Sequence, residues 1–476
     1  MDRKQTPDAA LSGACLERVT IMVEPINSSA RHVVAVIGAA TAGSEIANVL
    51  SERGAVVVVF EQNPRPYGKI EDGLPRWHVK QRKDEYEEIN KRLARPNVEF
   101  VPLTRMGRDL AFDELREKWG FSAVVLALGA WRDRQFPVAE ADRYLDRGLI
   151  YQNPLIYWFN HYVEKAYDGP RYDLVPGAIV IGGGLASIDV VKVLQIEMAL
   201  KGLRSRGIVE EMLRLEREGI EPVLNSHKLT WADLGIAPSK LFYRRRVLDM
   251  PLSDIAPDAP PKRAEAMRQA RAKILEKAQR KYLFEFEDRR VPTGLIVEGD
   301  RLAGLQISHT EVIEGKARTL PNSQEPVRSA LTISSIGSIP EPIPGIPQRG
   351  EVYQYVDEKI GLLLDGPTAV YAAGNVLTGK GNIKDSLDSG SEIGILVAER
   401  YLGLADDGSR TPLAEAMREA THQAAEGMAA SITSRDPLPA ATVAQILGRV
   451  RKRQLAVGYD GNYREWIARV TPADLQ

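Results

Sequence analysis

The stretch that decides the fold is His32-Val33-Val34-Ala35-Val36-Ile37-Gly38-Ala39-Ala40-Thr41-Ala42-Gly43, near the start of the chain. An unbroken apolar run that ends at a glycine is typical of a strand buried on both faces of a parallel sheet. Positions 46, 49 and 50 are apolar at helical spacing, and a second apolar run at 55–60 ends at Glu61. This strand–turn–helix–strand order predicts one βαβ unit.

The glycine-rich turn of this unit lies where a phosphate-binding turn is expected. Gly38 permits the tight turn, Gly43 permits close helix–strand packing, and the small Ala40 lets backbone N–H groups approach a pyrophosphate. Glu61 is placed to accept hydrogen bonds from an adenosine ribose, and its charge would repel a 2′-phosphate. The turn therefore predicts a nucleotide with a plain ribose; the alternative is a chance turn of small residues.

The same motif occurs a second time. The apolar run 178–181 leads into Gly182-Gly183-Gly184-Leu185-Ala186-Ser187, and apolar residues at helical spacing follow. The next expected strand, 240–243, leads into Arg244-Arg245-Arg246 instead of an acid. Guanidinium groups at that place suit the 2′-phosphate of NADPH, although a solvated basic turn is the alternative. Two nucleotides of different kinds predict a flavin that exchanges reducing equivalents with NADPH.

The order of the segments predicts an α/β fold with two Rossmann-like dinucleotide-binding domains, the NADP domain inserted within the FAD domain. A late buried strand at 369–374 and a helix at about 385–401 return the chain to the first unit. The expected parts are listed in chain order: an N-terminal arm (1–30), the first part of the FAD domain (31–137), the NADP domain (138–339), the returning part of the FAD domain (340–404) and a helical C-terminal extension (405–476).

The composition of the whole chain excludes several classes of redox, metal and nucleic-acid site. With Cys15 as its one cysteine, the chain has no internal disulfide, CxxC pair or Cys₄ iron–sulfur site, so an organic cofactor or a partner must supply the redox centre. The six histidines lack zinc-site spacing, and no metal site is predicted. A net charge of −1 gives no reason to expect nucleic acid, and no apolar run is long enough for a membrane span. We expect a cytoplasmic protein; its oligomeric state stays open.

These segments together resemble the adrenodoxin reductase type of ferredoxin–NADP⁺ reductase over roughly residues 31–403. The residues that carry the resemblance are Val36-Ile37-Gly38 onward, Phe60-Glu61, Pro66-Tyr67-Gly68 with Gly73 and His78, Gly129-Ala130, Ile181 to Asp189, Ser334 to Gly337, and Gly374 to Ile383. Tyr243-Arg244-Arg245-Arg246 with Met250-Pro251 also resembles the glutamate synthase small subunit. That cousin has the same two-nucleotide core and a cysteine-rich iron–sulfur domain that this chain lacks.

The resemblance implies FAD in the outer domain and NADPH in the inserted one, with hydride passing between nicotinamide and flavin N5. Electrons would then pass singly to or from a ferredoxin or flavodoxin. The residues expected to bind FAD are Gly38, Ala40, Gly43, Glu61, Gly68, Gly129, Gly374, Asn375, Gly381, Asn382 and Ile383. The residues expected to bind NADP(H) are Gly182, Gly184, Leu185, Ala186, Ser187, Arg245 and Arg246.

The resemblance also implies three catalytic residues and a docking surface. His78 and Asp189 match a histidine and an acid near the flavin, where a histidine could relay protons; a core hydrogen bond is the alternative for His78. Asp254 is a weaker analogue of an acid near the nicotinamide. The predicted helix 261–282 carries eight basic and two acidic side chains. The family docks its acidic partner on basic residues in this region, which implies docking by Arg263, Arg268 and Arg271; a solvated helix face is the alternative.

Three functions therefore remain open from the sequence. The leading one is an NADPH–ferredoxin or NADPH–flavodoxin reductase. The second is an NADPH-dependent flavoprotein that reduces a small molecule or serves as a subunit of a larger electron-transfer complex. The third is a flavin-binding scaffold without turnover, which reduction of the flavin by NADPH would exclude.

Overall fold

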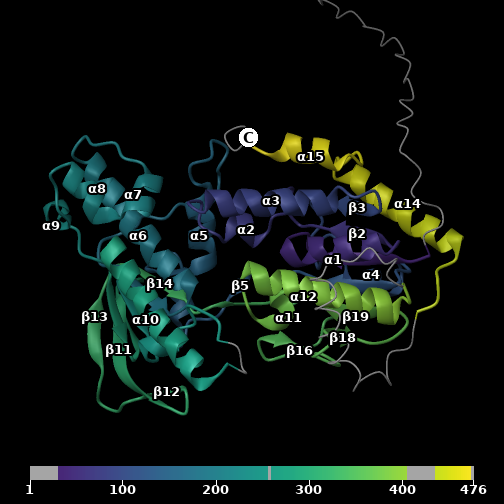
Figure 1. The fold of residues 1–476 in the computed structure, drawn as a ribbon. Helices are drawn as coiled ribbons and strands as arrows, with labels where there is room; N and C mark the ends of the chain where they lie inside the picture. Colours follow the sequence, from purple (N-terminus) through teal and green to yellow (C-terminus); the bar gives the residue numbers. More distant parts are fainter. Residues whose placement is uncertain (1–30, 256–258, 405–434, 473–476) are drawn as a thin grey trace, which may run out of the picture.

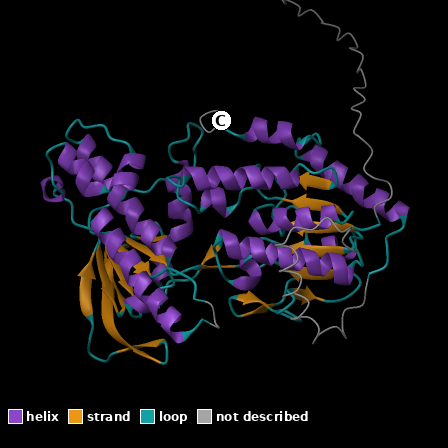
Figure 2. Ribbon diagram, viewed as in Figure 1, coloured by secondary structure: helices purple, strands orange, loops and turns teal. Residues whose placement is uncertain are grey.

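A computed structural model describes residues 31–255, 259–404 and 435–472 (Figure 1). The predicted N-terminal arm and the first thirty residues of the predicted C-terminal extension lie outside the described residues. Two sheets of mainly parallel strands lie side by side, and each is flanked by helices (Figure 2).

The first sheet contains the strand that opens the sequence argument. Its strand order is β18-β19-β4-β1-β2-β3, and only the edge strand β18 is antiparallel. The strands are β1 (Val33–Ile37), β2 (Val56–Phe60), β3 (Val98–Val101), β4 (Ala123–Leu126), β18 (Leu362–Leu364) and β19 (Ala369–Ala372). Every residue of β1, β2, β4 and β19 is buried, as expected for strands covered on both faces.

Helices from both ends of this unit cover the first sheet. They are α1 (Thr41–Glu52), α2 (Lys69–Asp72), α3 (Val79–Leu93), α4 (Phe112–Glu117), α11 (Asn375–Thr378) and α12 (Ile383–Leu396), which continues as a π-helical turn, η3 (Val397–Tyr401). Helices α1 and α12 cross closely because α12 has glycines at the contact. A Cβ on Gly390 would lie 2.8 Å from the carbonyl oxygen of Ala42.

The second sheet is formed by residues between those of the first. All its strands are parallel, in the order β6-β14-β7-β8-β9. They are β6 (Leu149–Tyr151), β7 (Ile179–Gly182), β8 (Lys240–Tyr243), β9 (Glu285–Asp288) and β14 (Thr332–Ser335). The helices are α5 (Gln152–His161), α6 (Leu185–Arg204), α7 (Met212–Glu218), α8 (Ile220–Ser226), α9 (Trp231–Leu234) and α10 (Pro261–Tyr282), with 3₁₀ turns η1 (Ala141–Tyr144) and η2 (Val247–Asp249). The basic helix expected from the sequence at 261–282 is present as α10.

Smaller antiparallel elements complete the chain. Strands β10 (Arg290–Glu298), β11 (Arg301–Ile313), β12 (Lys316–Thr319) and β13 (Glu325–Arg328) form a sheet beside α10, and β16 (Gln348–Arg349) pairs with β17 (Val352–Tyr353). The chain enters the second unit through β5 (Arg132–Asp133) and leaves it through β15 (Ser338–Ile339), and these two strands pair with each other. The insertion of one α/β unit within another is therefore confirmed, whereas the domain boundaries at 138 and 339 remain a proposal.

The C-terminal helices α14 (Ala440–Ala456) and α15 (Tyr463–Val470) pack on the first unit. The buried Gln454 donates a hydrogen bond to the carbonyl oxygen of Phe100 in β3 at 3.0 Å. Trp466 donates one to the carbonyl oxygen of Pro64 at 2.7 Å. These helices therefore complete the core of the first unit. None of the helices in the described residues is long and apolar enough to cross a membrane.

Candidate functional site

One continuous cavity of about 2520 Å³ extends from the first sheet to the second. Both glycine-rich turns open into it, since each follows the carboxyl end of a parallel strand in its own unit. Such strand ends are where ligands bind in open α/β sheets. The predicted site residues that line the cavity are Gly38, Ala40, Glu61, Gly68, His78, Gly129, Gly182, Gly184, Leu185, Ala186, Ser187, Asp189, Arg245, Asp254, Arg263, Arg271, Asn375, Gly381, Asn382 and Ile383.

Four predicted site residues are absent from this lining: Gly43, Arg246, Arg268 and Gly374. Gly43 permits the helix to pack closely against the turn, because a Cβ there would lie 1.8 Å from the carbonyl oxygen of Gly38. Gly374 packs against α1, where its Cβ would lie 2.8 Å from the Cβ of Ala42. The two arginines lie on the surface and form ion pairs on their own segments, as described below.

The first turn is fixed by Glu61. Gly38 has φ +98°, and a Cβ there would lie 2.5 Å from the carbonyl oxygen of Ala127 in the neighbouring strand end. The buried Glu61 carboxylate accepts hydrogen bonds from the backbone N–H groups of Ala39 at 3.0 Å and Asn63 at 2.9 Å. Burial raises the pKa of Glu61 to about 7, although these backbone donors lower it. Further hydrogen-bond donors, such as the hydroxyls of a ribose, would stabilise the charged carboxylate.

The returning segment supplies the other side of this half of the cavity. Asn375 begins α11 beside the end of β19, and its buried Oδ1 atom has no hydrogen-bond partner among the described residues. A buried acceptor without a donor is costly, so this atom fits a hydroxyl donor on a bound ligand. Asn382 caps α12 by accepting the N–H of Asp385 at 2.7 Å, which fixes the loop that carries Gly381. These residues fit the polar chain of a flavin nucleotide.

The second turn uses its three glycines differently. A Cβ on Gly182 would lie 2.2 Å from Ser187 Oγ, and one on Gly183 would lie 2.1 Å from the ring of Tyr243. A Cβ on Gly184 would meet no atom within 4 Å. Ser187 Oγ donates to the carbonyl oxygen of Ser335 at 2.9 Å and so ties the start of α6 to β14. The first two glycines therefore serve packing, and Gly184 leaves open space where a pyrophosphate would approach the N-terminus of α6.

The three arginines after β8 have different surroundings. Arg244 and Arg245 line the cavity. The Arg245 guanidinium donates to Tyr243 Oη at 3.0 Å and lies beside that ring. Arg246 is exposed and pairs with Asp249 at 2.9 Å. Arg244 belongs to the basic cluster predicted from the sequence but not to the residues expected to bind NADP(H). It is placed better than Arg246 to contact a ligand in the cavity.

His78 and Asp189 belong to a network around Lys192. The buried Lys192 ammonium contacts Asp189 at 3.3 Å and Glu216 at 3.5 Å, and it lies 4.4 Å from the ring centre of Trp77. Burial raises the pKa of Asp189, and the Lys192 charge opposes that shift. Burial lowers the pKa of His78, while Asp189 opposes the shift. Sequence reasoning missed Lys192, although its position three residues after Asp189 places both on one helix face.

The predicted docking residues on α10 do not share one surface. Arg263 and Arg271 line the cavity together with Lys277 and Lys281. Arg271 is held by the carbonyl oxygens of Ser253 and, at 3.3 Å, Leu248. Arg268 is exposed and pairs with Glu265 at 3.4 Å. Part of the basic run on α10 therefore borders the cavity, where Arg271 and Lys281 are partly buried and Arg263 and Lys277 remain exposed.

Comparison with known proteins gives partial matches in sequence and a fuller match in fold. No family model matches the chain. A segment of 161 residues is 32% identical to the glutamate synthase [NADPH] small chain of Bacillus subtilis, covering 33% of this chain and 31% of that protein. A segment of 170 residues is 29% identical to the NADPH-Fe(3+) oxidoreductase subunit beta of Geobacter sulfurreducens, covering 34% of this chain and 22% of that protein. The matched part thus spans less than a third of these curated relatives.

The solved structure of FprA from Mycobacterium tuberculosis in complex with NADPH matches with a TM-score of 0.61 at 17% identity. The match covers 89% of this chain and 90% of that one, which shows a shared fold over nearly the whole described molecule. Another structure of FprA, described as an oxidoreductase, matches with a TM-score of 0.62. The resemblances inferred from the sequence are confirmed: the small-chain relatives match in sequence, and FprA matches in fold.

Proposed function

We propose that this chain is an oxidoreductase that binds FAD at the first turn and NADPH at the second. The observation that supports this most strongly is the shared cavity, because two nucleotide turns that open into one space bring two cofactors together. The relatives named for NADPH and the fold of FprA support the same assignment. A bound flavin would supply the exchange of hydride for single electrons.

The residues of the chain would divide the work of binding. Glu61 accepts hydrogen bonds from the ribose hydroxyls of the FAD adenosine, and the backbone N–H groups after Ala39, at the start of α1, face its pyrophosphate. Gly184 leaves room for the pyrophosphate of NADPH, and Arg244 and Arg245 pair with its 2′-phosphate. His78, with Asp189 and Lys192 beside it, is the proposed proton carrier, because its lowered pKa keeps the imidazole neutral and ready to accept a proton.

We propose that the electron partner is a ferredoxin or flavodoxin, with Arg263, Arg268 and Arg271 as the candidate docking residues. A second candidate is a small acidic acceptor, or a role as one subunit of a larger electron-transfer complex. The specific observation in its favour is that Arg263 and Arg271 line the cavity, where a small anion could reach them. The names of the sequence relatives, a small chain and a subunit, support the role within a complex.

The test is stopped-flow spectroscopy of the reconstituted protein. FAD should bind and should be bleached faster by NADPH than by NADH; a protein that takes up no FAD would end the proposal. Reoxidation by a panel of ferredoxins and flavodoxins, compared with small quinones, then separates the two acceptor classes. In Asp189→Ala, the FAD should stay bound while reduction slows, and an unchanged rate would leave Asp189 with a structural role alone.

A further inference from the structure

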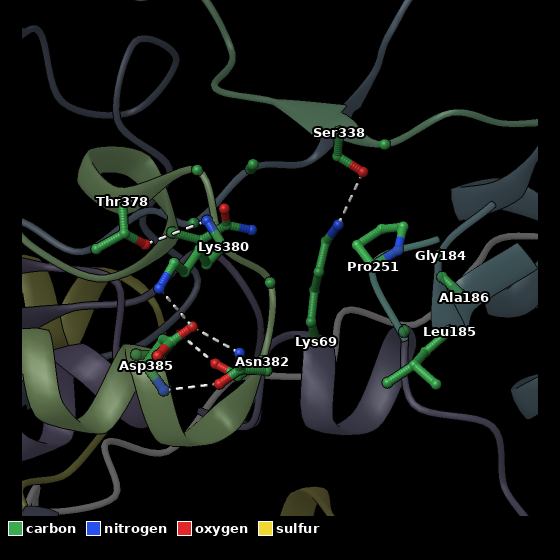
Figure 3. Close-up of a pocket in the computed structure, with 18 of the residues that line it drawn as sticks. Lys69, Gly184, Leu185, Ala186, Pro251, Ser338, Thr378, Lys380, Asn382 and Asp385 are labelled. Carbon is green, nitrogen blue, oxygen red and sulfur yellow. Dashed lines mark hydrogen bonds and ion pairs between the residues drawn. The ribbon is translucent and has the colours of Figure 1, made fainter. Parts of the chain in front are cut away.

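Lys69 connects the first nucleotide turn to the two-stranded ribbon of β5 and β15, which joins the two units. Its backbone follows Gly68, where an added Cβ would lie 2.9 Å from the Cβ of Ala40 in the turn. Its Nζ atom donates to Asn153 Oδ1 at 3.1 Å and to Ser338 Oγ at 3.2 Å, at the start of β15. Figure 3 shows the side chain standing between the Gly184 turn and the loop that carries Asn382, and all these residues line the same cavity.

The charge of Lys69 has no direct anionic partner in the described part of the chain. Both of its hydrogen-bond acceptors are neutral side chains. Asp133 attracts it only through space, and the Asp133 carboxylate accepts the backbone N–H of Asn153 at 3.3 Å. Burial lowers the pKa of Lys69 to about 8, against the attraction of Asp133. A cation held where its charge is costly is stabilised when an anion comes close.

The position of Lys69 indicates which anion that is. Glu61 and the first turn hold the adenosine and pyrophosphate of a flavin dinucleotide, so its flavin half must extend from Gly68 toward the junction of the two units. The Lys69 side chain runs over the same interval, from the turn to Ser338. The Lys69 side chain therefore lies beside the interval expected for the flavin ring. This ring becomes negatively charged on reduction.

We propose that Lys69 is the electrostatic partner of the reduced flavin ring and raises the reduction potential of the bound FAD. Asn153 and Ser338 hold the ammonium in place by accepting its hydrogen bonds. Lys69 thereby sets how favourably NADPH hands over its hydride, and it acts without taking part in bond making. This inference rests on the proposed function, since it requires FAD at the first turn.

The experiment is an equilibrium redox titration of the FAD-loaded protein at pH 7.5, together with sulfite binding. Sulfite adds to an oxidised flavin and leaves the ring negatively charged, so its affinity reports nearby positive charge without NADPH or an acceptor. Lys69→Met should lower the potential and weaken sulfite binding roughly tenfold or more. Lys69→Arg should retain most of both, because it keeps the charge. Lys83→Met, on the exposed face of α3, is the matched control and should equal the wild type.

Asp133→Asn provides a test that does not alter Lys69. It removes a negative charge beside the ammonium and keeps an acceptor for Asn153. Measured at pH 6.5 for both the variant and the wild type, where Lys69 stays protonated, the potential should rise and sulfite should bind more tightly. A potential and a sulfite affinity unchanged in Lys69→Met would overturn the inference. If Lys69→Met does not retain FAD, an unchanged or lower potential in Asp133→Asn would overturn it. Failure of the wild type to bind FAD would overturn the proposed function itself, which is a different result.

Discussion

The two nucleotide turns have the same backbone plan and opposite chemistry at the end of the following strand. In the first unit β2 is followed by Glu61, which is buried and accepts a hydrogen bond from the N–H of Ala39 in the turn. In the second unit β8 is followed by Arg244 and Arg245, which line the cavity. The acid is hydrogen-bonded to its turn, whereas the two arginines line the cavity, where they can contact a ligand. On the proposed assignment, discrimination between two dinucleotides rests on the residues that follow one strand, while the turn itself binds the phosphates.

The largest effect is expected at a glycine whose substitution the turn cannot accommodate. Gly43→Ala should prevent FAD binding and lower the thermal midpoint, because its Cβ would lie 1.8 Å from the carbonyl oxygen of Gly38. Overpacking costs about 1–3 kcal/mol and occasionally more, and a contact this short with backbone belongs at the upper end. In contrast, Gly184→Ala should fold normally, since its Cβ meets nothing within 4 Å, and should weaken NADPH binding alone. Flavin absorbance, thermal melting and NADPH titration measure these effects; a destabilised Gly184→Ala would contradict the division between packing and ligand glycines.

The second prediction concerns Glu61→Gln. We expect FAD affinity to fall roughly ten- to hundredfold, because hydrogen bonds to a charged acceptor are worth about 1.5–3 kcal/mol. The protein without FAD should also change its pH dependence of stability. Folding raises the pKa of Glu61 to about 7, so the wild type loses stability as the pH rises from its unfolded pKa of 4.5 through 7. The glutamine variant lacks that loss, so its melting temperature should fall less than that of the wild type between pH 4.5 and pH 8.

The third prediction separates the three arginines. Arg244→Ala and Arg245→Ala should each reduce the preference for NADPH over NADH in kcat/KM by about tenfold, the effect of losing one charge-assisted contact. Arg246→Ala should leave the preference nearly unchanged, because Arg246 is exposed and paired with Asp249. An Arg246→Ala variant that loses the preference would restore the assignment made from the sequence and would place the 2′-phosphate outside the cavity.

The smallest effect is expected at the surface of α10. Arg268→Glu should lower the association rate with an acidic ferredoxin about two- to threefold at low salt, and the effect should disappear as salt rises. Reduction of a neutral dye should not change, since the dye needs only access to the flavin. Lys91→Glu, on the exposed face of α3, serves as the control for general charge effects. Equal losses in both variants would remove α10 from the docking surface.

The sequence by itself determined the βαβ order, the two turns and the insertion of one unit in the other. Buried parallel strands read as unbroken apolar runs, and glycines and helix spacing mark the turns, so these features are local in the chain. Glu61 and the arginines were found for the same reason, because each directly follows a strand. The basic helix was also predicted with its bounds, since its pattern is continuous from Pro261 to Tyr282.

Only the tertiary structure decided which of these residues face the cavity. Arg244 and Arg246 have the same side chain two positions apart, and the ion pair with Asp249 separates them. Lys192 and Lys69 gain their roles from partners brought close by folding, such as Trp77 and Ser338. On α10, the neighbours of the helix decided that Arg271 lines the cavity and Arg268 does not. The physical reason is that periodicity places a residue on a face of its own element, while the packing of elements decides what that face meets.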